Sequence, residues 1–165
     1  MPSTYEPIAT QTLSSPAASV TFNSIPSTYT DVILIVSATP STSGYLGYIV
    51  INGDSGANYS ETLLYGTGST AGSNRESNRN KGYAGNWTVQ NSTSSPSVFE
   101  IHFQNYANTS VYKTFLGRNS DAGTETGATV NLWRSTSAIN SIGFTASGVN
   151  ITAGSTFTLY GIKAA

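Results

Sequence analysis

The stretch Ser97–Gln104, which reads SVFEIHFQ, shows most directly how this chain is expected to fold. Phe99, Ile101 and Phe103 alternate with polar neighbours, and a period of two indicates a β-strand with one buried face. The same stretch contains Val98–Gln104, the longest run in the sequence without Gly, Pro, Ser, Thr or Asn. A run of about seven residues allows two helical turns at most, so no substantial helix is expected.

Strand-like runs recur along the rest of the chain, separated by clusters of Gly, Asn, Asp and Ser. Short β-branched and aromatic runs about 10–15 residues apart are typical of an all-β sandwich or barrel. The sequence therefore predicts an all-β fold, an antiparallel β-sandwich of about 8–10 strands. The expected strands are Ser19–Ile25, Asp31–Ala38, Tyr45–Ile51, Tyr59–Tyr65, Tyr83–Val89, Ser97–Gln104, Tyr112–Arg118, Ala128–Arg134, Ala138–Ala146 and Thr156–Ile162.

The strand Asp31–Ala38 differs from the others because Val32–Val36 is an apolar run without a polar alternate. Continuous apolar runs of this kind are typical of strands that are buried on both faces. We therefore expect this strand to be covered by the opposing sheet and by a second layer, such as a partner subunit. Val32, Leu34 and Val36 are accordingly candidate interface residues.

The length predicts a single domain, 1–165, with an extended amino-terminal segment of about residues 1–13. Residues 66–81 contain no apolar side chain larger than Ala71, so a long exposed loop is expected there. The predicted core consists of Phe22, Ile35, Phe99, Ile101, Phe103, Leu132, Phe144, Phe157 and Leu159.

The composition argues against several classes of function. Seven Lys and Arg against eight Asp and Glu give a net charge of −1, so no basic excess is available to bind nucleic acid. The absence of Cys removes thiolate metal sites, thiol nucleophiles and disulfides. The longest strongly apolar run, Val32–Val36, is far shorter than the about 20 residues of a membrane span, and the amino terminus has no secretory pattern. We expect a soluble protein made in a cytoplasm.

No catalytic, metal or cofactor site is predicted. His102 is the one histidine, and it lies within an expected strand without a G-x-S-x-G motif, so a half-exposed structural histidine is the better interpretation. The eight acidic residues are scattered along the chain, which leaves open whether two of them meet in space. The loop 52–61 carries several oxygen side chains, but its spacing does not match a calcium loop and a hairpin turn is preferred.

Arg75, Arg79 and Lys81 form a small basic cluster in the segment expected to be a loop. Two interpretations are open for it: a solvated loop, or contact with an acidic protein surface. Ten Tyr, together with Trp87 and Trp133, supply aromatic surface among 25 Ser and 23 Thr. Such a mixture suits sugar binding and protein interfaces equally well.

Five segments of the chain, taken in order, carry a resemblance to one group of proteins. The segments are TQTLSSPAASVTFNSIPSTYTDVILIV (10–36), INGDSGANYSETLLYG (51–66), FQNYANTSVYKTFLGR (103–118), VNLWRSTSAINSI (130–142) and ITAGSTFTLYGIKA (151–164). Together they are similar to small virion proteins of tailed bacteriophages, which are common in phages of aquatic bacteria and cyanobacteria. The resemblance covers almost the whole chain and is weakest over residues 66–86.

The resemblance implies a non-enzymatic structural component of the virion, with a jelly-roll-like β-sandwich and homotrimeric assembly. A compact domain without a fibre shaft favours a capsid decoration (cement) protein that stabilises the head by binding the major capsid protein. We then expect residues 66–81 and the amino-terminal segment to contact the shell, with Arg75, Arg79 and Lys81 meeting acidic groups.

Two other functions are open. The first is a tail-fibre or receptor-binding module that recognises host-surface glycans through Tyr and Trp faces, and the second is a polysaccharide depolymerase. Under the favoured interpretation the chain resides in the virion, assembled in the host cytoplasm, and needs no cofactor, nucleic acid or membrane.

Overall fold

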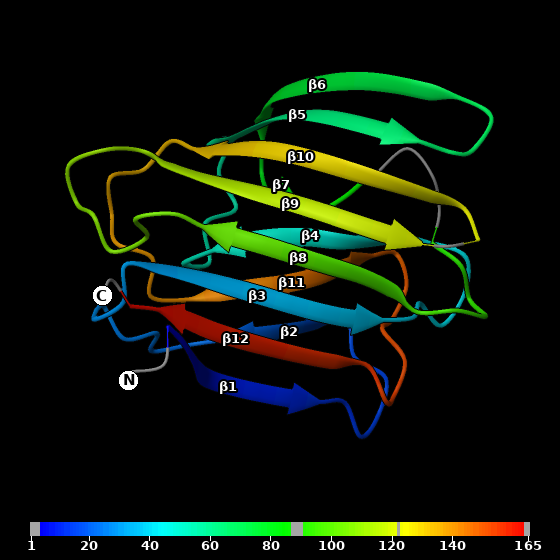
Figure 1. Cartoon of the computed structure of the whole chain (residues 1–165), viewed down its shortest axis with the longest axis horizontal. Coiled ribbons are helices and arrows are strands. Elements are labelled where there is room, and N and C mark those ends of the chain that lie inside the picture. Colours follow the sequence, from blue (N-terminus) through cyan, green and yellow to red (C-terminus); the bar gives the residue numbers. More distant parts are fainter. Residues whose placement is uncertain (1–3, 87–90, 122, 164–165) are drawn as a thin grey trace.

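The computed structural model describes residues 4–86, 91–121 and 123–163, which form two antiparallel β-sheets packed face to face (Figure 1). The described residues contain no α-helix, and hence none that could span a membrane. The predicted antiparallel, jelly-roll-like β-sandwich is confirmed. The larger sheet has the order β1 (Tyr5–Thr12), β12 (Thr156–Ile162), β3 (Asp31–Ala38), β8 (Ser97–Phe103), β9 (Lys113–Asp121), β10 (Glu125–Trp133), β5 (Tyr59–Gly66) and β6 (Ala71–Arg79). The smaller sheet has the order β2 (Ser19–Phe22), β11 (Ile142–Ser147), β4 (Tyr45–Ile51) and β7 (Gly82–Tyr83).

The predicted bounds are confirmed for three strands. β3, β4 and β12 have the predicted bounds. The predicted strand Tyr83–Val89 is described only as the two-residue β7, and residues 87–90 lie outside the described part of the chain.

The predicted loop at residues 66–81 is wrong, because most of it forms the edge strand β6. β6 pairs along its length with β5, and most of its side chains are exposed. An edge strand held by backbone hydrogen bonds needs no apolar alternation, which is why the sequence pattern gave no signal. The amino-terminal segment likewise contains a strand, β1, which pairs with β12 at the opposite edge.

The core lies between the sheets, and aromatic rings join them. Phe144 of β11 packs edge-on against Phe99 of β8 at 5.2 Å between ring centroids and against Phe157 of β12 at 5.6 Å. Within the larger sheet, Phe103 and Phe115 stack at 5.1 Å. All five rings are at most 1% exposed, so aromatic packing accounts for much of the contact between the layers.

β3 follows a period of two even though its sequence does not show one. Val32, Leu34 and Val36 are 0% exposed inside the chain's own core, so they have no surface left for a partner, and the structure corrects their expected interface role. Ile33 and Ile35 face outward; Ile33 is nonetheless buried at 6% exposure, whereas Ile35 is 40% exposed rather than in the core. The predicted cover on the outer side of this strand is therefore incomplete.

Leu132 is the other predicted core residue that the structure corrects, because it is only half-buried. It pairs with Thr114 of β9 and Ser60 of β5 on the outward side of β10. Its neighbour Trp133 occupies the inward position instead, at 2% exposure. The sequence run Val130–Trp133 contains apolar residues on both faces, so composition alone could not choose the register.

A group of buried polar side chains holds β7 and the residues after it on the inner face of β9 and β10. We call this group the polar seam; its members are Asn86, Asn119, Asp121, Glu125 and Asn131. The Asn131 side chain donates to the Tyr83 carbonyl at 2.8 Å and accepts from the Tyr83 N–H at 2.9 Å. Close approach is possible because Gly117 has no side chain, and a Cβ there would lie 2.6 Å from the Ala84 carbonyl. The amide groups satisfy a backbone that would otherwise be buried without partners.

The seam continues toward the β9–β10 hairpin through two buried carboxyl groups. Asp121 accepts from the Ser92 N–H at 2.7 Å and from the Ser97 hydroxyl at 3.0 Å. Glu125 accepts from the side-chain amides of Asn119, at 3.0 Å, and Asn86. Burial raises the pKa of Glu125 above its ordinary value, although both amide hydrogen bonds oppose the shift.

We predict that Phe103→Ala lowers the free energy of unfolding by about 3–5 kcal/mol, because it leaves a cavity beneath the stacked Phe115 ring. The matched outward variant Ile35→Ala should cost less than about 1 kcal/mol. Urea unfolding followed by fluorescence measures both. Equal losses in the two variants would contradict the inward and outward assignment of β3 and β8.

The raised pKa of Glu125 predicts a pH effect on stability. The folded state holds the proton more tightly than the unfolded state, so this contribution is complete below about pH 4.5 and decreases as the pH rises through the raised value. The stability of Glu125→Gln relative to the unchanged protein should therefore increase between pH 4.5 and neutral pH. Urea titrations at several pH values test this, and a constant difference or a decrease would contradict it.

Candidate functional site

The structure places His102 where the sequence analysis expects it, half-buried on a strand. Its Nε2 lies 2.9 Å from Asp31 Oδ2, and the other carboxylate oxygen of Asp31 accepts from the Asn105 N–H at 2.8 Å. No described serine hydrogen-bonds to the ring. The His102–Asp31 pair therefore joins β8 to β3 and fixes the turn that follows β8.

Two pairs of acidic residues are cross-strand partners. Asp121 and Glu125 are opposite each other in the β9–β10 hairpin, and both are engaged in the polar seam. Glu61 of β5 is opposite Glu76 of β6, and Glu76 forms an ion pair with Arg79. Among the residues that the structure describes, no group of three or more His, Asp or Glu has a geometry that could hold a metal ion.

The loop after β4 is not the hairpin turn that the sequence predicts, because β4 belongs to the smaller sheet and the next strand, β5, belongs to the larger one. Asn52 and Gly53 adopt positive φ values of 52° and 69°. Asp54 then accepts from the Trp133 indole N–H at 2.7 Å and from the Asn58 amide at 2.9 Å. Burial alone would raise the pKa of Asp54, but these bonds and one from the Gly56 N–H outweigh it and lower the pKa. Its oxygens are thus used within the loop.

The same hydrogen bond removes Trp133 from the list of sugar-stacking candidates. Its side chain is 2% exposed and its indole N–H is bound, so neither ring face reaches a ligand. Trp87 lies outside the described residues. Tyr59 and Tyr83 are also buried, and burial raises the pKa of each hydroxyl to about 12. The expected glycan contact through exposed Trp faces is therefore without support at Trp133.

The predicted basic cluster is not a single patch. Arg75 is exposed and points outward from β6, beside Thr62. Arg79 forms an ion pair with Glu76 at 2.7 Å and also donates to the Tyr83 hydroxyl. Lys81 places its Nζ 3.9 Å from the centroid of the Tyr48 ring, and burial lowers its pKa. Of the three, Arg75 alone is exposed on the outer face of the larger sheet.

The outer face of the larger sheet carries most of the exposed apolar surface. We call this surface the apolar face, and it extends over β3, β8, β9, β10 and β5, which lie in front in Figure 1. Five adjacent strands spaced about 4.8 Å apart make it roughly 20 Å wide. Its members are 40–63% exposed: Ile35, Leu64, Val98, Leu116 and Val130.

Charged groups lie within and beside the apolar face. Glu100 and Arg118 form an ion pair between Ile35 on one side and Leu64, beyond Ala128, on the other. A groove of about 610 Å³ contains Val130 in its lining, and its charged lining residues are Arg75, Arg134 and the buried Glu61. Arg134 is held in place by the carbonyl of Ala57 at 2.9 Å and the Asn78 side chain at 3.1 Å.

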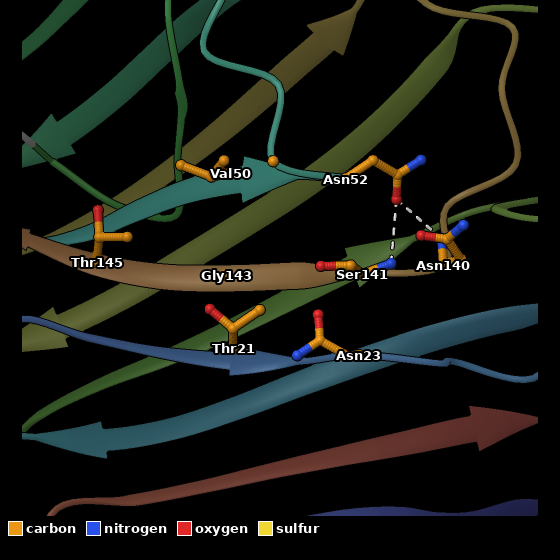
Figure 2. Close-up of a pocket in the computed structure, with 9 residues that line it drawn as sticks. Thr21, Asn23, Val50, Asn52, Asn140, Ser141, Gly143 and Thr145 are labelled. Atoms are coloured by element: carbon orange, nitrogen blue, oxygen red, sulfur yellow. Dashed lines mark hydrogen bonds between the residues drawn. The ribbon is translucent and has the colours of Figure 1, made fainter.

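A second surface feature lies on the outer face of the smaller sheet (Figure 2). It is a hollow of about 470 Å³, which we call the hydroxyl hollow. Its lining contains no charged residue and consists of Thr21, Asn23, Val50, Asn52, Gly53, Asn140, Ser141, Gly143 and Thr145.

Sequence reasoning missed both surfaces for different reasons. Val98, Leu116 and Val130 occupy the alternate positions of strands that were predicted, so counting outward positions would have revealed the apolar face. The hydroxyl hollow joins residues from β2, β4 and β11, which are adjacent only because of the sheet order. No local sequence signal carries that order.

Comparisons with known proteins identify no family for this chain. No protein-family model matches it, and neither does any curated protein sequence. Among solved structures, the galectin LEC-6 of Caenorhabditis elegans is similar with a TM-score of 0.35 and 8% identity, over 94% of this chain and 96% of the galectin. A mutant of the alginate lyase Aly36B in complex with an alginate tetrasaccharide has a TM-score of 0.29 and 10% identity, over 94% of this chain and 80% of the lyase.

Proposed function

We propose that this chain is a non-enzymatic structural protein of a tailed-phage virion, a capsid decoration protein that docks its apolar face on the shell of the head. The shell partner is the major capsid protein. The observation that carries the proposal is the apolar face itself, with five large apolar side chains exposed on one side of the larger sheet. Leu116 and Val130 are direct cross-strand neighbours at its centre, and exposed apolar patches mark protein interaction sites.

The charges beside the apolar face favour an acidic partner. Arg75 and Arg134 line the groove at its β6 side, while Glu100 is already paired with Arg118. Exposed ion pairs at the rim of an interface contribute at most about 1 kcal/mol each, so they set the orientation more than the affinity. Burial of the apolar side chains supplies the larger part of the binding free energy.

Decoration requires only modest affinity per copy. Each chain that bridges neighbouring shell subunits is held by two contacts, and the second forms at a high effective concentration. A near-neutral surface with few charges suits this arrangement, because many copies can pack side by side without strong mutual repulsion. Such bridges oppose the separation of shell subunits under the outward pressure of packed DNA.

The proposal includes the homotrimer that the sequence resemblance implies. The inward residues of β3 no longer support it, since they are used in the core. The larger sheet instead ends in two edge strands, β1 and β6, whose outer sides pair with no other described strand. Contacts between different edges of neighbouring copies can close a ring of three.

We predict that Leu116→Glu combined with Val130→Glu weakens binding to purified phage shells by about tenfold or more, because apolar contact is lost and carboxylates meet acidic shell groups. The matched control is Val111→Glu with Tyr112→Glu, which changes two residues of similar exposure outside the apolar face. Co-sedimentation with shells measures binding. An equal loss in the control, or full binding by the face variant, would contradict the proposal.

We expect light scattering at micromolar concentration to report three times the 17.3 kDa chain mass. Cryo-microscopy of decorated particles should show threefold density at junctions of the shell. A 17.3 kDa species in solution together with isolated single copies on the particle would contradict the trimer. Density confined to the tail would overturn the assignment to the head.

A further inference from the structure

Gly143 lies in the interior of β11, where the fold itself does not require a glycine. Its φ is not among the positive values found in the chain. A Cβ built there would lie 3.3 Å from Thr21 Oγ1, a contact that a small movement of the threonine relieves. By contrast, a Cβ at Gly161 of β12 would lie 2.3 Å from the Tyr29 ring. A glycine inside a strand occurs at a bulge, at a bend, or where a ligand or another backbone approaches closely, and the register shift of β11 lies between Thr145 and Ser147 rather than at Gly143.

The sheet register surrounds Gly143 with hydroxyl and amide groups. Gly143 pairs with Thr21 of β2 on one side and with Val50 of β4 on the other. Ser141, which directly precedes β11, and Thr145 of β11 line the hollow two residues before and after Gly143. Figure 2 shows these side chains around the bare ribbon at Gly143, which forms the floor of the hydroxyl hollow.

Several polar groups of the hollow are available to a ligand. No described residue hydrogen-bonds the side chains of Thr21, Asn23, Ser141 and Thr145. The Asn52 side chain, in contrast, is fixed, because it accepts from the N–H groups of residues 140 and 141 at 2.9 and 3.0 Å and donates to the carbonyl of residue 138 at 2.8 Å. The hollow therefore combines a rigid rim with free donors and acceptors.

The chemistry of the lining selects a class of ligand. Hydroxyl and amide side chains each donate and accept, which matches the adjacent hydroxyl groups of a sugar ring. The lining has no cation to bind an anion and, beyond Val50, little apolar wall to hold a hydrophobic molecule. Its volume of about 470 Å³ lies within the range of small-molecule sites, about 300–1,000 Å³.

We propose that the hydroxyl hollow binds one neutral sugar residue, free or at the end of an oligosaccharide, with its C–H face toward Val50 and Gly143. The inference goes beyond the docking function and does not depend on it, because the hollow and the apolar face lie on opposite outer faces of the sandwich. A chain docked by its larger sheet turns the hollow to solvent.

The binding test uses the full chain and a panel of neutral methyl glycosides of glucose, galactose, mannose and N-acetylglucosamine. Nitrogen-15 NMR at about 10 mM sugar detects a dissociation constant of about 1 mM. At least one glycoside should shift the backbone amides of residues 21, 141, 143 and 145. Glucuronate and glucose 6-phosphate should bind with an affinity lower by about tenfold or more, since the lining offers no cation to pair with their negative charge. If no neutral glycoside shifts these amides, the proposal is wrong.

The second test measures sugar binding by variants in which substituted side chains fill the hydroxyl hollow or remove its hydroxyl groups. Gly143→Val should weaken sugar binding by about tenfold or more, because its side chain occupies the space of the ring. The matched control Gly66→Val changes another strand glycine with room for a Cβ and should bind as the unchanged protein does. Thr21→Val with Thr145→Val, which keeps the side-chain shape, should also weaken binding. Unchanged affinity in both hollow variants would overturn the proposal.

The two functional proposals fail separately. Gly143→Val should bind shells normally, and Leu116→Glu with Val130→Glu should bind sugar normally. Loss of shell binding alone therefore concerns the apolar face, and loss of sugar binding alone concerns the hydroxyl hollow.

Discussion

The inner face of an eight-stranded sheet must be covered, and the smaller sheet has only four strands with which to cover it. Over β12, β3 and β8 the cover is apolar, with Phe144 wedged between rings of the larger sheet. Over β9 and β10 the cover is the backbone after β7, and a backbone brings N–H and C=O groups that must be satisfied. The polar seam meets that requirement with side chains such as Asn131. The inner face of β9 and β10 also contributes Phe115 and Trp133 to the apolar core, so the polar seam is an amide-lined region beside that core, and the rest of the molecule depends on this division.

The division explains what the sequence could predict. Alternation identified the strands and most of the core, because burial of one face imposes a period of two on residues such as Phe99 and Phe103. It failed at β6, an edge strand that buries little, and at Ile35, where an apolar residue faces outward. The polar seam could not be predicted either. Its Asn, Asp and Glu residues look like exposed residues in the sequence, but contacts with residues far along the chain bury them.

The candidate sites show the same limit. Arg75, Arg79 and Lys81 were grouped because they are close in sequence, yet the register shift in β6 between Glu76 and Arg79 and the path to β7 turn them toward different neighbours. Conversely, the hydroxyl hollow groups Thr21, Val50 and Ser141, which are distant in sequence and share one face only through the order β2-β11-β4. Sequence proximity is a poor guide to surface proximity in a sandwich, because each strand distributes its neighbours over two faces.

The burial and pairing of the acidic residues affect how the protein can associate with a partner. Three of the eight, Glu61, Asp121 and Glu125, are buried, and the other five have hydrogen-bonding or ion-pair partners within the chain: Glu6, Asp31, Asp54, Glu76 and Glu100. Little unbalanced charge is then left on the surface to steer a partner over long distances. In the proposed docking, short-range contact of apolar groups therefore supplies most of the affinity, and Arg75 and Arg134 set the orientation. Such contact is weak for a single copy, so the proposed role depends on repetition, as on a shell that presents the same site many times.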